Sequence, residues 1–363
     1  ADAAFVHDAP GAGPSAGGRQ AARSATLTLT RRAMACDFQI SLHASAEQNE
    51  TPAAMAALDA IEAVEARLTV YRDSSEVADI NAAAGRGPAP VSGEVFDLLR
   101  LADRLHRQTG GAYDITSGPL SEAWGFSRRR GRLPGKQELA DALARVGWSR
   151  CRLDLEQQAL ELPSPGVQIN FNSVGKGYAL DCAARVLDEH GVDHCLLHGG
   201  RSTLVARGAS LRGAPQEQAR GAPAPCPAGW QVGVRHPLRP QVRLAECTLR
   251  DAAFSTSGSA TQRFVVGGRQ YGHLIDPRTG WPAEGLHSVS VVAPTGAEAD
   301  ALSTALYVMG LEAGEAYCRT RPEVQALFVV PGDGPGEGPS GVATRGVNLD
   351  PACWRLASVG ARP

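Results

Sequence analysis

Four stretches rich in glycine and polar side chains, at 110–126, 170–181, 255–263 and 271–280, interrupt the regular apolar patterns of this chain. Glycines where strands and helices end let the backbone approach a ligand closely, and free N–H groups at a helix start bind anions. The stretch 271–280 also carries His273 and Asp276. We therefore ask which single reaction would use all four stretches.

The length of the chain leaves one or two domains open. The chain has 363 residues, which one α/β or α+β domain can reach if it carries insertions. Residues 1–25 are rich in Ala, Gly, Pro and Ser, so we expect a flexible N-terminal arm before a folded part that begins near Thr26. The same composition predicts a flexible insertion at about 209–229 and a Gly/Pro-rich loop at about 331–345.

The spacing of apolar residues predicts both strands and helices. Helices are expected from Pro52 to Leu68, over 92–109, near 136–146, from the glycines at 175–177 through Leu187, and over 297–310. Ser75 is a candidate cap for a short segment ending at Asn81. Strands are expected at 27–30, 36–42, 151–162, 195–197, 230–235, 262–266 and 289–292, from Gln168, and around Trp354. The hydroxyl-rich stretch 254–261 is interpreted as a turn.

Charge and cysteine usage exclude several classes of function. The net charge is −2 and no basic stripe is present, which argues against nucleic acid as a partner. No apolar run reaches the roughly 20 residues of a transmembrane helix. The eight cysteines form no CxxC or Cys/His pattern, so we expect buried free thiols rather than a zinc site or a disulfide framework.

A few residue types point to chemistry, each with an ordinary alternative. Asp300 and Thr304 lie four apart on a helix, which suits a hard cation such as Mg²⁺, although spacing alone favours an ordinary polar face. His273 can act in proton transfer. Alternatively it is a core histidine, since on an alternating strand Tyr271, His273 and Ile275 point to the same face. Lys176 follows a glycine at a helix start that could bind an anion, but the surrounding residues do not form a P-loop.

The ordered set of motifs resembles the ApbE family of FAD:protein FMN transferases. These motifs are Met34, Tyr71-Arg72, Ser74-Ser75-Glu76, Ile80-Asn81, Gly111 to Thr116, Gly118-Pro119-Leu120, Trp124-Gly125-Phe126, Val174 to Ala179, Asp181, Gly199-Gly200, Thr256-Ser257-Gly258, His273 to Gly280 and Ala299 to Ala305. The resemblance covers about 27–310. It implies an α+β, ApbE-like fold of mixed, largely antiparallel sheets with packed helices, in a single domain over 26–363.

The resemblance also implies an activity and a site. Family members pass the FMN half of FAD to a Thr or Ser hydroxyl of an acceptor flavoprotein and release AMP, and some hydrolyse FAD to FMN and AMP. By this resemblance Mg²⁺ is held by Asp300, Thr304 and a carbonyl near Ser173. The positions expected to contact FAD are Met34, Tyr71, Ala112, Tyr113, Asp114, Asn170, Lys176 and Ile275. His273 is the candidate general base, with Asp276 orienting it or sharing its role.

Two positions depart from the family pattern. Asn170 stands where the family usually has aspartate, and Arg201 stands where an acidic residue usually follows the paired glycines. Three functions therefore remain open, namely an FMN transferase, an FAD pyrophosphatase and a flavin-binding protein without turnover. Family members commonly work outside the cytoplasmic membrane, but the unpatterned cysteines leave the compartment of this chain open.

Overall fold

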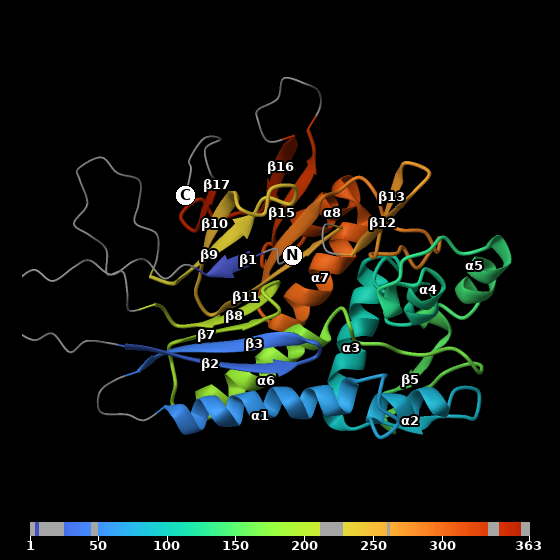
Figure 1. The fold of residues 1–363 in the computed structure, drawn as a ribbon. Coiled ribbons are helices and arrows are strands. Elements are labelled where there is room, and N and C mark those ends of the chain that lie inside the picture. Colours follow the sequence, from blue (N-terminus) through green and yellow to red (C-terminus); the bar gives the residue numbers. More distant parts are fainter. Residues whose placement is uncertain are drawn as a thin grey trace, which may run out of the picture.

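An eight-stranded sheet runs through the middle of the molecule, in the order β16-β15-β14-β11-β8-β7-β3-β2 (Figure 1). The computed structural model describes residues 4–6, 25–44, 50–210, 228–259, 262–332 and 341–356. The strands of this sheet are β2 (Ala25–Ala33), β3 (Cys36–Ala44), β7 (Cys195–Gly199), β8 (Thr203–Arg207), β11 (Ala252–Gly258), β14 (Ser288–Ala293), β15 (Gln325–Pro331) and β16 (Val342–Val347). All of its neighbouring strands are antiparallel, which confirms the predicted fold class.

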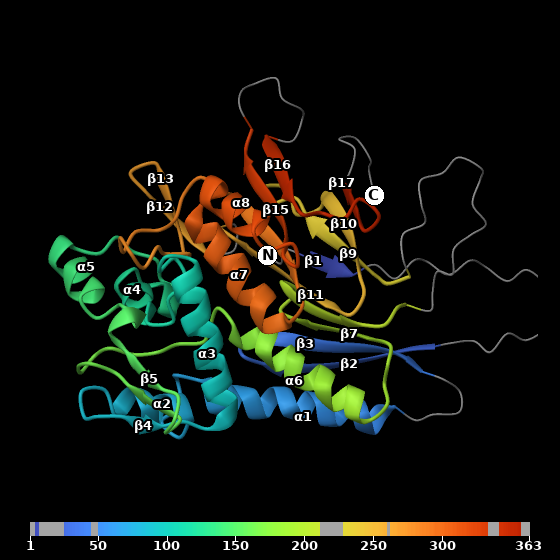
Figure 2. The ribbon, with the colours of Figure 1, turned by 180° about the vertical axis from the view of Figure 1, so that it is seen from behind.

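Both faces of this sheet are covered. Helices α1 (Thr51–Leu68), α6 (Gly175–Glu189) and α7 (Gly296–Met309) pack on one face (Figure 2). A four-stranded sheet covers the other and consists of β1 (Ala4–Val6), β9 (Trp230–Arg235), β10 (Arg243–Leu249) and β17 (Trp354–Leu356). Successive side chains of a strand point to opposite faces. Every residue of β14 is therefore buried, including Ser290, whose hydroxyl lies 2.8 Å from that of Thr256 on β11.

The remaining elements lie beside this three-layer core, at the end where the helices of residues 76–143 gather (Figures 1 and 2). They are α2 (Glu76–Ala82), β4 (Ala89–Pro90), α3 (Gly93–Gln108), α4 (Gly118–Ala123), α5 (Lys136–Leu143), β5 (Arg152–Asp154), β6 (Ala159–Glu161), the hairpin β12 (Arg263–Val266) and β13 (Arg269–Gly272), and 3-10 turns at Phe126–Arg128 and Trp148–Arg150. Helix α8 (Leu311–Arg319) instead packs beside α7, against β15 and β16 of the main sheet. Within the described ranges, no helix has both the length and the apolar character that a bilayer span requires.

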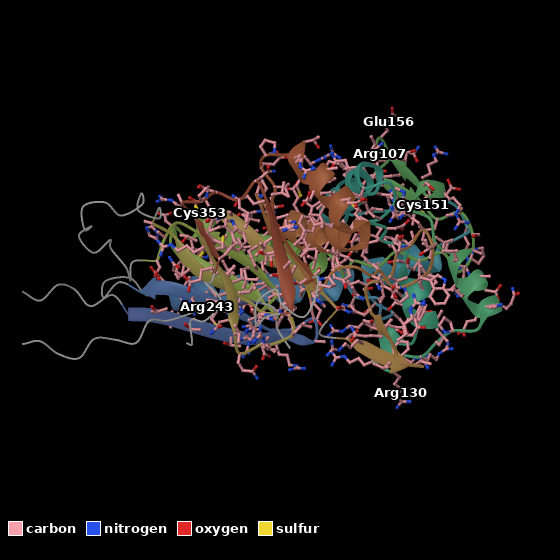
Figure 3. All side chains as sticks on the ribbon, turned by 90° about the horizontal axis from the view of Figure 1, so that it is seen from above. Arg107, Arg130, Cys151, Glu156, Arg243 and Cys353 are labelled. Carbon is pink, nitrogen blue, oxygen red and sulfur yellow. The ribbon has the colours of Figure 1, made fainter. Side chains whose placement is uncertain are left out.

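The cysteines are buried only in part, since Cys36, Cys151 and Cys353 are half-buried while the other four described cysteines are buried. The seven cysteines of the described residues are all free. In the view from above, the labelled Cys353 lies over the small sheet and Cys151 at the helical end (Figure 3). Burial raises the pKa of the Cys195 thiol to about 12, so this cysteine is an unreactive core residue.

Helix positions were predicted well because periodicity and capping are local properties. In α1 the residues Leu58, Ile61, Val64 and Leu68 form the buried stripe, as their spacing indicates. Ser75 caps α2, since its hydroxyl accepts the N–H of Ala78 at 3.0 Å.

Several predictions for strands and loops were wrong. The stretch expected to be a hydroxyl-rich turn is strand β11, and the segment from Gln168 forms no strand. The loop expected at 331–345 ends earlier, because Val342 already pairs with Pro331 in the ladder between β16 and β15. Residues 4–6 of the expected arm pair with β9. The other residues before 25, and 211–227 of the expected insertion, lie outside the described residues.

Helices α6 and α7 touch through their backbones. A Cβ atom added to Gly177 would lie 1.9 Å from the carbonyl oxygen of Gly296. The contact is fixed by Asp181, whose carboxylate accepts the N–H groups of Gly296 at 2.7 Å and Ala297 at 2.8 Å. A carboxylate at a helix N-terminus satisfies free N–H groups and favours the helix dipole. Only glycine at residue 177 therefore allows α6 to approach the start of α7 this closely.

We predict that Gly177→Ala lowers the free energy of unfolding by at least about 2 kcal/mol, because the added methyl group must push two backbones apart. Urea denaturation followed by circular dichroism measures the change. Gly93→Ala is the matched control, since nothing lies within 4 Å of a Cβ at that helical glycine. The control should stay within about 1 kcal/mol of the wild type. Equal stability of both variants would show that the α6–α7 contact is not tight.

Candidate active site

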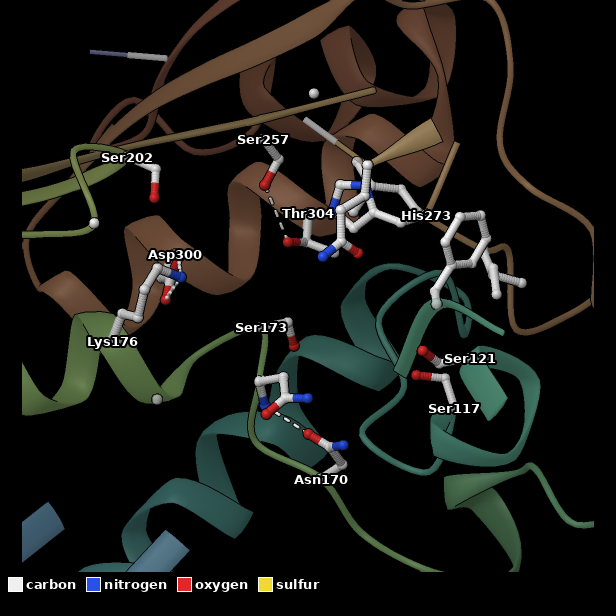
Figure 4. Close-up of a pocket in the computed structure, with 18 of the residues that line it drawn as sticks. Ser117, Ser121, Asn170, Ser173, Lys176, Ser202, Ser257, His273, Asp300 and Thr304 are labelled. Atoms are coloured by element: carbon white, nitrogen blue, oxygen red, sulfur yellow. Dashed lines mark hydrogen bonds and ion pairs between the residues drawn. The ribbon is translucent and has the colours of Figure 1, made fainter. Parts of the chain in front are cut away.

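One cavity of about 650 Å³ brings the predicted site residues together. Its lining includes every predicted site residue except Asp276, namely Met34, Tyr71, Ala112, Tyr113, Asp114, Asn170, Ser173, Lys176, His273, Ile275, Asp300 and Thr304. These residues come from all parts of the folded chain. Asp300 and Lys176 lie on one side of the close-up, His273 on another, and Asn170 below them (Figure 4).

Asp300 is a buried carboxylate with donors from three neighbouring elements. Its side chain is on α7 and the residue is 4% exposed. Oδ1 accepts hydrogen bonds from the hydroxyls of Thr203 on β8 at 3.0 Å and Ser255 on β11 at 3.2 Å. Oδ2 accepts the N–H of Gly177 at 3.2 Å, and the Lys176 ammonium lies 3.1 Å from both oxygens. These partners satisfy the carboxylate oxygens where solvent is excluded.

A chain of hydroxyl groups connects Asp300 to Thr304. Ser303 lies 3.4 Å from Ser255, which bonds Asp300, and 2.8 Å from Ser257. Ser257 in turn lies 3.1 Å from the Thr304 hydroxyl (Figure 4). An ordinary solvent-facing polar face, which spacing alone favours, is therefore not what α7 has, because this helix is buried nearly all round. The polar groups of α7 face partners on β8 and β11 rather than solvent.

The oxygen atoms at this end of the cavity fit a hard divalent cation. Asp300 supplies a carboxylate and Thr304 a hydroxyl one helical turn away, and Ser173 lines the same cavity. No group of three or more His, Cys, Asp or Glu side chains that could hold a metal occurs in the part of the chain that the structure describes. One carboxylate with few further protein oxygens is the pattern of Mg²⁺ sites completed by substrate phosphates and water. The donor set therefore suits Mg²⁺ better than Zn²⁺.

The segment 169–175 lines the cavity but is not part of a sheet; hydrogen bonds from Asn81 and from the backbone of Ile115 hold it in place. Asn81 holds it with two hydrogen bonds, donating to the carbonyl of Ile169 at 3.0 Å and accepting its N–H at 2.7 Å. The next N–H, of Asn170, donates to the carbonyl of Ile115 at 2.8 Å. These bonds replace a strand ladder, which is why an extended sequence here forms no strand. The sequence pattern does not reveal that Asn81 builds the site, although this residue lies in a motif of the resemblance.

The side chain of Asn170 shapes the turn before α6. Its Oδ1 accepts the N–H of Asn172 at 2.7 Å (Figure 4). An aspartate oxygen could accept the same bond, so the departure from the family pattern preserves this turn. Arg201 has a positive φ of 59° and is not among the residues that line the cavity.

Asp114 supports the wall of the cavity. Its Oδ1 accepts the N–H and the hydroxyl of Thr116, at 2.8 and 2.6 Å, and its Oδ2 accepts the N–H of Trp148 at 2.9 Å. The carboxylate is therefore engaged within the protein. The neighbouring Tyr113 accepts a hydrogen bond from Ser173 at 3.3 Å, and burial raises the pKa of its phenol.

The cavity mouth carries an exposed aromatic ring and a strained turn. Tyr71 is 70% exposed although it lines the cavity, so its ring can stack on a flat ligand. Met34 and Ala35, between β2 and β3, have φ angles of 47° and 59°. Two-residue hairpin turns with positive φ favour Asn and Gly, so Met-Ala is an unfavourable sequence here. Backbone strain of this kind clusters at functional sites, and here the strained turn carries Met34, which lines the cavity.

His273 presents a buried nitrogen without a hydrogen-bond partner. Strand β13 ends at Gly272, so the alternation predicted through Ile275 stops before the histidine. The His273 backbone N–H donates to the carbonyl of Gln262 at 3.1 Å, and the ring Nδ1 has no hydrogen-bond partner among the described residues. Burial, with a smaller effect from Lys176, lowers the pKa of His273 below its usual value. The ring is therefore neutral at pH 7 and can accept a proton.

Asp276 is not placed to orient His273. Its carboxylate binds the side chain of Arg278 through both oxygens, at 2.8 Å each, and accepts the Arg278 N–H at 2.9 Å. Its own N–H donates to the carbonyl of Trp281 at 2.8 Å. These bonds close the turn over 276–281, and no hydrogen bond joins Asp276 to His273 in the described residues. The geometry thus assigns Asp276 to the turn.

Comparison with known proteins agrees with this geometry. The model of the ApbE family matches residues 34–328. The chain belongs to the ApbE family. An FAD:protein FMN transferase of Klebsiella pneumoniae is 32% identical over 273 residues, covering 74% of each chain. An ApbE flavinyl transferase structure from Pseudomonas stutzeri covers 89% of this chain and 95% of that one, with a TM-score of 0.73 and 28% identity. A Vibrio cholerae flavin transferase ApbE, at 24% identity and a TM-score of 0.76, shares the fold and covers 89% of this chain and 97% of that one.

We predict that Asn81→Ala lowers the free energy of unfolding by about 2–4 kcal/mol, because the buried N–H and carbonyl of Ile169 both lose their partner. Thermal or urea unfolding measures the loss. Asn172→Ala is the control, since its side chain is exposed and the hydrogen bond of this residue comes from its backbone N–H, which the substitution keeps. The control should change stability by less than about 0.5 kcal/mol. A similar small change in Asn81→Ala would contradict the role given to this side chain.

Proposed function

We propose that this protein is an Mg²⁺-dependent FAD:protein FMN transferase. It moves the FMN moiety of FAD to a Ser or Thr hydroxyl of an acceptor flavoprotein and releases AMP. The observation that carries the proposal is the unpartnered Nδ1 of a neutral His273 in the same cavity as Asp300 and Thr304. The names of the ApbE relatives support it, as does a cavity whose volume lies in the range of small-molecule sites.

The two ends of the cavity suit the two parts of the reaction. FAD lies with its diphosphate between Lys176 and His273, and Tyr71 packs against a ring at the mouth. The acceptor hydroxyl attacks the phosphorus atom of the FMN half and forms a new O–P bond. The bond from that phosphorus to the bridging oxygen breaks, and AMP leaves with the electron pair. The hydroxyl proton passes to His273, which is neutral because burial lowers its pKa.

The protein groups stabilise the charge that develops on the diphosphate. Asp300 and Thr304, with a carbonyl near Ser173, would hold Mg²⁺, which neutralises charge on the phosphate oxygens when bound. The Lys176 ammonium adds a second positive charge. Asp276 and Arg278 keep the turn after His273 in place.

Incubation of the protein with FAD and Mg²⁺ tests this proposal, with and without an acceptor domain that offers a Ser or Thr. AMP is followed by chromatography and acceptor mass by mass spectrometry. We expect AMP and an acceptor heavier by one FMN moiety. Free FMN and AMP in equal amounts, with no gain of acceptor mass, would replace the proposal by FAD hydrolysis. Unchanged FAD would exclude both enzymatic activities.

We predict that His273→Ala lowers kcat/KM by about 10²–10⁴-fold while FAD still binds, because the general base is lost. His190→Ala, an exposed histidine at the end of α6, is the control and should keep full activity. The wild-type rate should fall in acid as His273 becomes protonated. Because its pKa is lowered, the midpoint of this fall should lie below pH 6.5. A midpoint above that value, or an active His273→Ala, would contradict the assignment.

A further inference from the structure

The Lys176 ammonium occupies the open side of the Asp300 carboxylate. It lies 3.1 Å from each carboxylate oxygen, the close-up shows the Lys176 side chain ending at Asp300 (Figure 4), and both residues line the cavity. The remaining sides of the carboxylate are taken by Thr203, Ser255 and the Gly177 N–H. A divalent cation that approaches Asp300 from the cavity therefore meets the ammonium first.

An ammonium and a metal ion cannot share this position. Mg²⁺ binds oxygen at about 2.0–2.1 Å, well inside the distance at which the ammonium now lies. Two positive charges this close repel strongly where water is largely excluded. Lys176 is on the first turn of α6, and its side chain is 24% exposed, so its flexible stem can turn toward the cavity.

We propose that Lys176 and the divalent cation compete for Asp300, and that the substrate diphosphate decides the competition by drawing the ammonium away. In the nucleotide-free protein Lys176 neutralises the buried Asp300 and lowers its affinity for metal. A diphosphate in the cavity offers the ammonium another anion and offers the metal further oxygen ligands. Metal and dinucleotide therefore bind with strong positive coupling, and each raises the affinity of the other by the same factor.

Binding of Mn²⁺, a spectroscopic stand-in for Mg²⁺, tests the competition without catalysis. Electron paramagnetic resonance measures free Mn²⁺ in titrations of the nucleotide-free protein. We expect Lys176→Met to bind Mn²⁺ at least tenfold more tightly than the wild type, because the competing charge is gone. Lys136→Met is a matched control, since Lys136 is exposed at the start of α5 and is the only other lysine of the chain. Equal or weaker Mn²⁺ binding by Lys176→Met would overturn the proposal.

The coupling itself is measured with FAD present, after correction for Mn²⁺ bound by FAD alone. In the wild type, saturating FAD should lower the dissociation constant of Mn²⁺ at least tenfold. In Lys176→Met this factor should shrink at least fivefold, because no ion pair has to break. A factor that is the same in both proteins would contradict the role of Lys176.

A second measurement uses the wild type and so does not depend on the folding of a variant. With only two lysines, isotope-labelled lysine gives two side-chain signals in nuclear magnetic resonance, and Lys136→Met assigns them. The Lys176 signal should shift when FAD is added without metal, and also when Mg²⁺ saturates the nucleotide-free protein. A Lys176 signal that stays in place under both conditions would overturn the proposal.

The inference rests on the proposed function for its diphosphate substrate, but the two can fail separately. If no AMP forms from FAD while Lys176→Met binds Mn²⁺ more tightly, the transferase proposal fails and the competition stands. If AMP forms while Lys176→Met and the wild type bind Mn²⁺ equally, the competition fails alone.

Discussion

The charge of the buried Asp300 carboxylate constrains the rest of the structure. An ionised group removed from water is strongly destabilising unless paired and hydrogen-bonded, so the fold must deliver donors to it. Those donors come from α6, β8 and β11, while the carboxylate itself is on α7. The backbone contact between Gly177 and Gly296 brings α6 and α7 close enough for this arrangement. Core packing and the candidate cation site thus depend on the same few contacts.

The opposite end of the cavity is built on a different principle. His273 follows a short hairpin and keeps an unpartnered Nδ1, and burial holds its pKa low. A rigid polar network at one end and a neutral proton acceptor at the other are the components that a phosphoryl transfer requires. Asn170 and Arg201, the two departures from the family pattern, change neither group. Asn170 serves as a turn residue, and Arg201 lies outside the cavity lining.

Much of the architecture was predictable from local patterns. Periodicity and capping located α1, α2 and α3, because helix formation depends on residues three and four apart. Strand β11 was missed because hydroxyl residues in sequence resemble a turn. Ser255 and Ser257 are nevertheless two apart, as side chains on one face of a strand must be, and this spacing is the signal that could have revealed them. The segment 168–171 was wrongly predicted as a strand, because its hydrogen bonds are made with Asn81, which is far away in sequence.

The sequence by itself determined the helices, the apolar strands, the family and most of the residues that meet at the cavity, since these follow from local spacing and ordered motifs. Only the tertiary structure decided what each polar group does there. It paired Lys176 with Asp300, engaged Asp114 and Asp276 within the protein, and gave Nδ1 of His273 no partner in the part of the chain that the structure describes. The physical reason is that burial and hydrogen-bond partners set the charge and availability of a side chain. Both depend on residues that are distant along the chain.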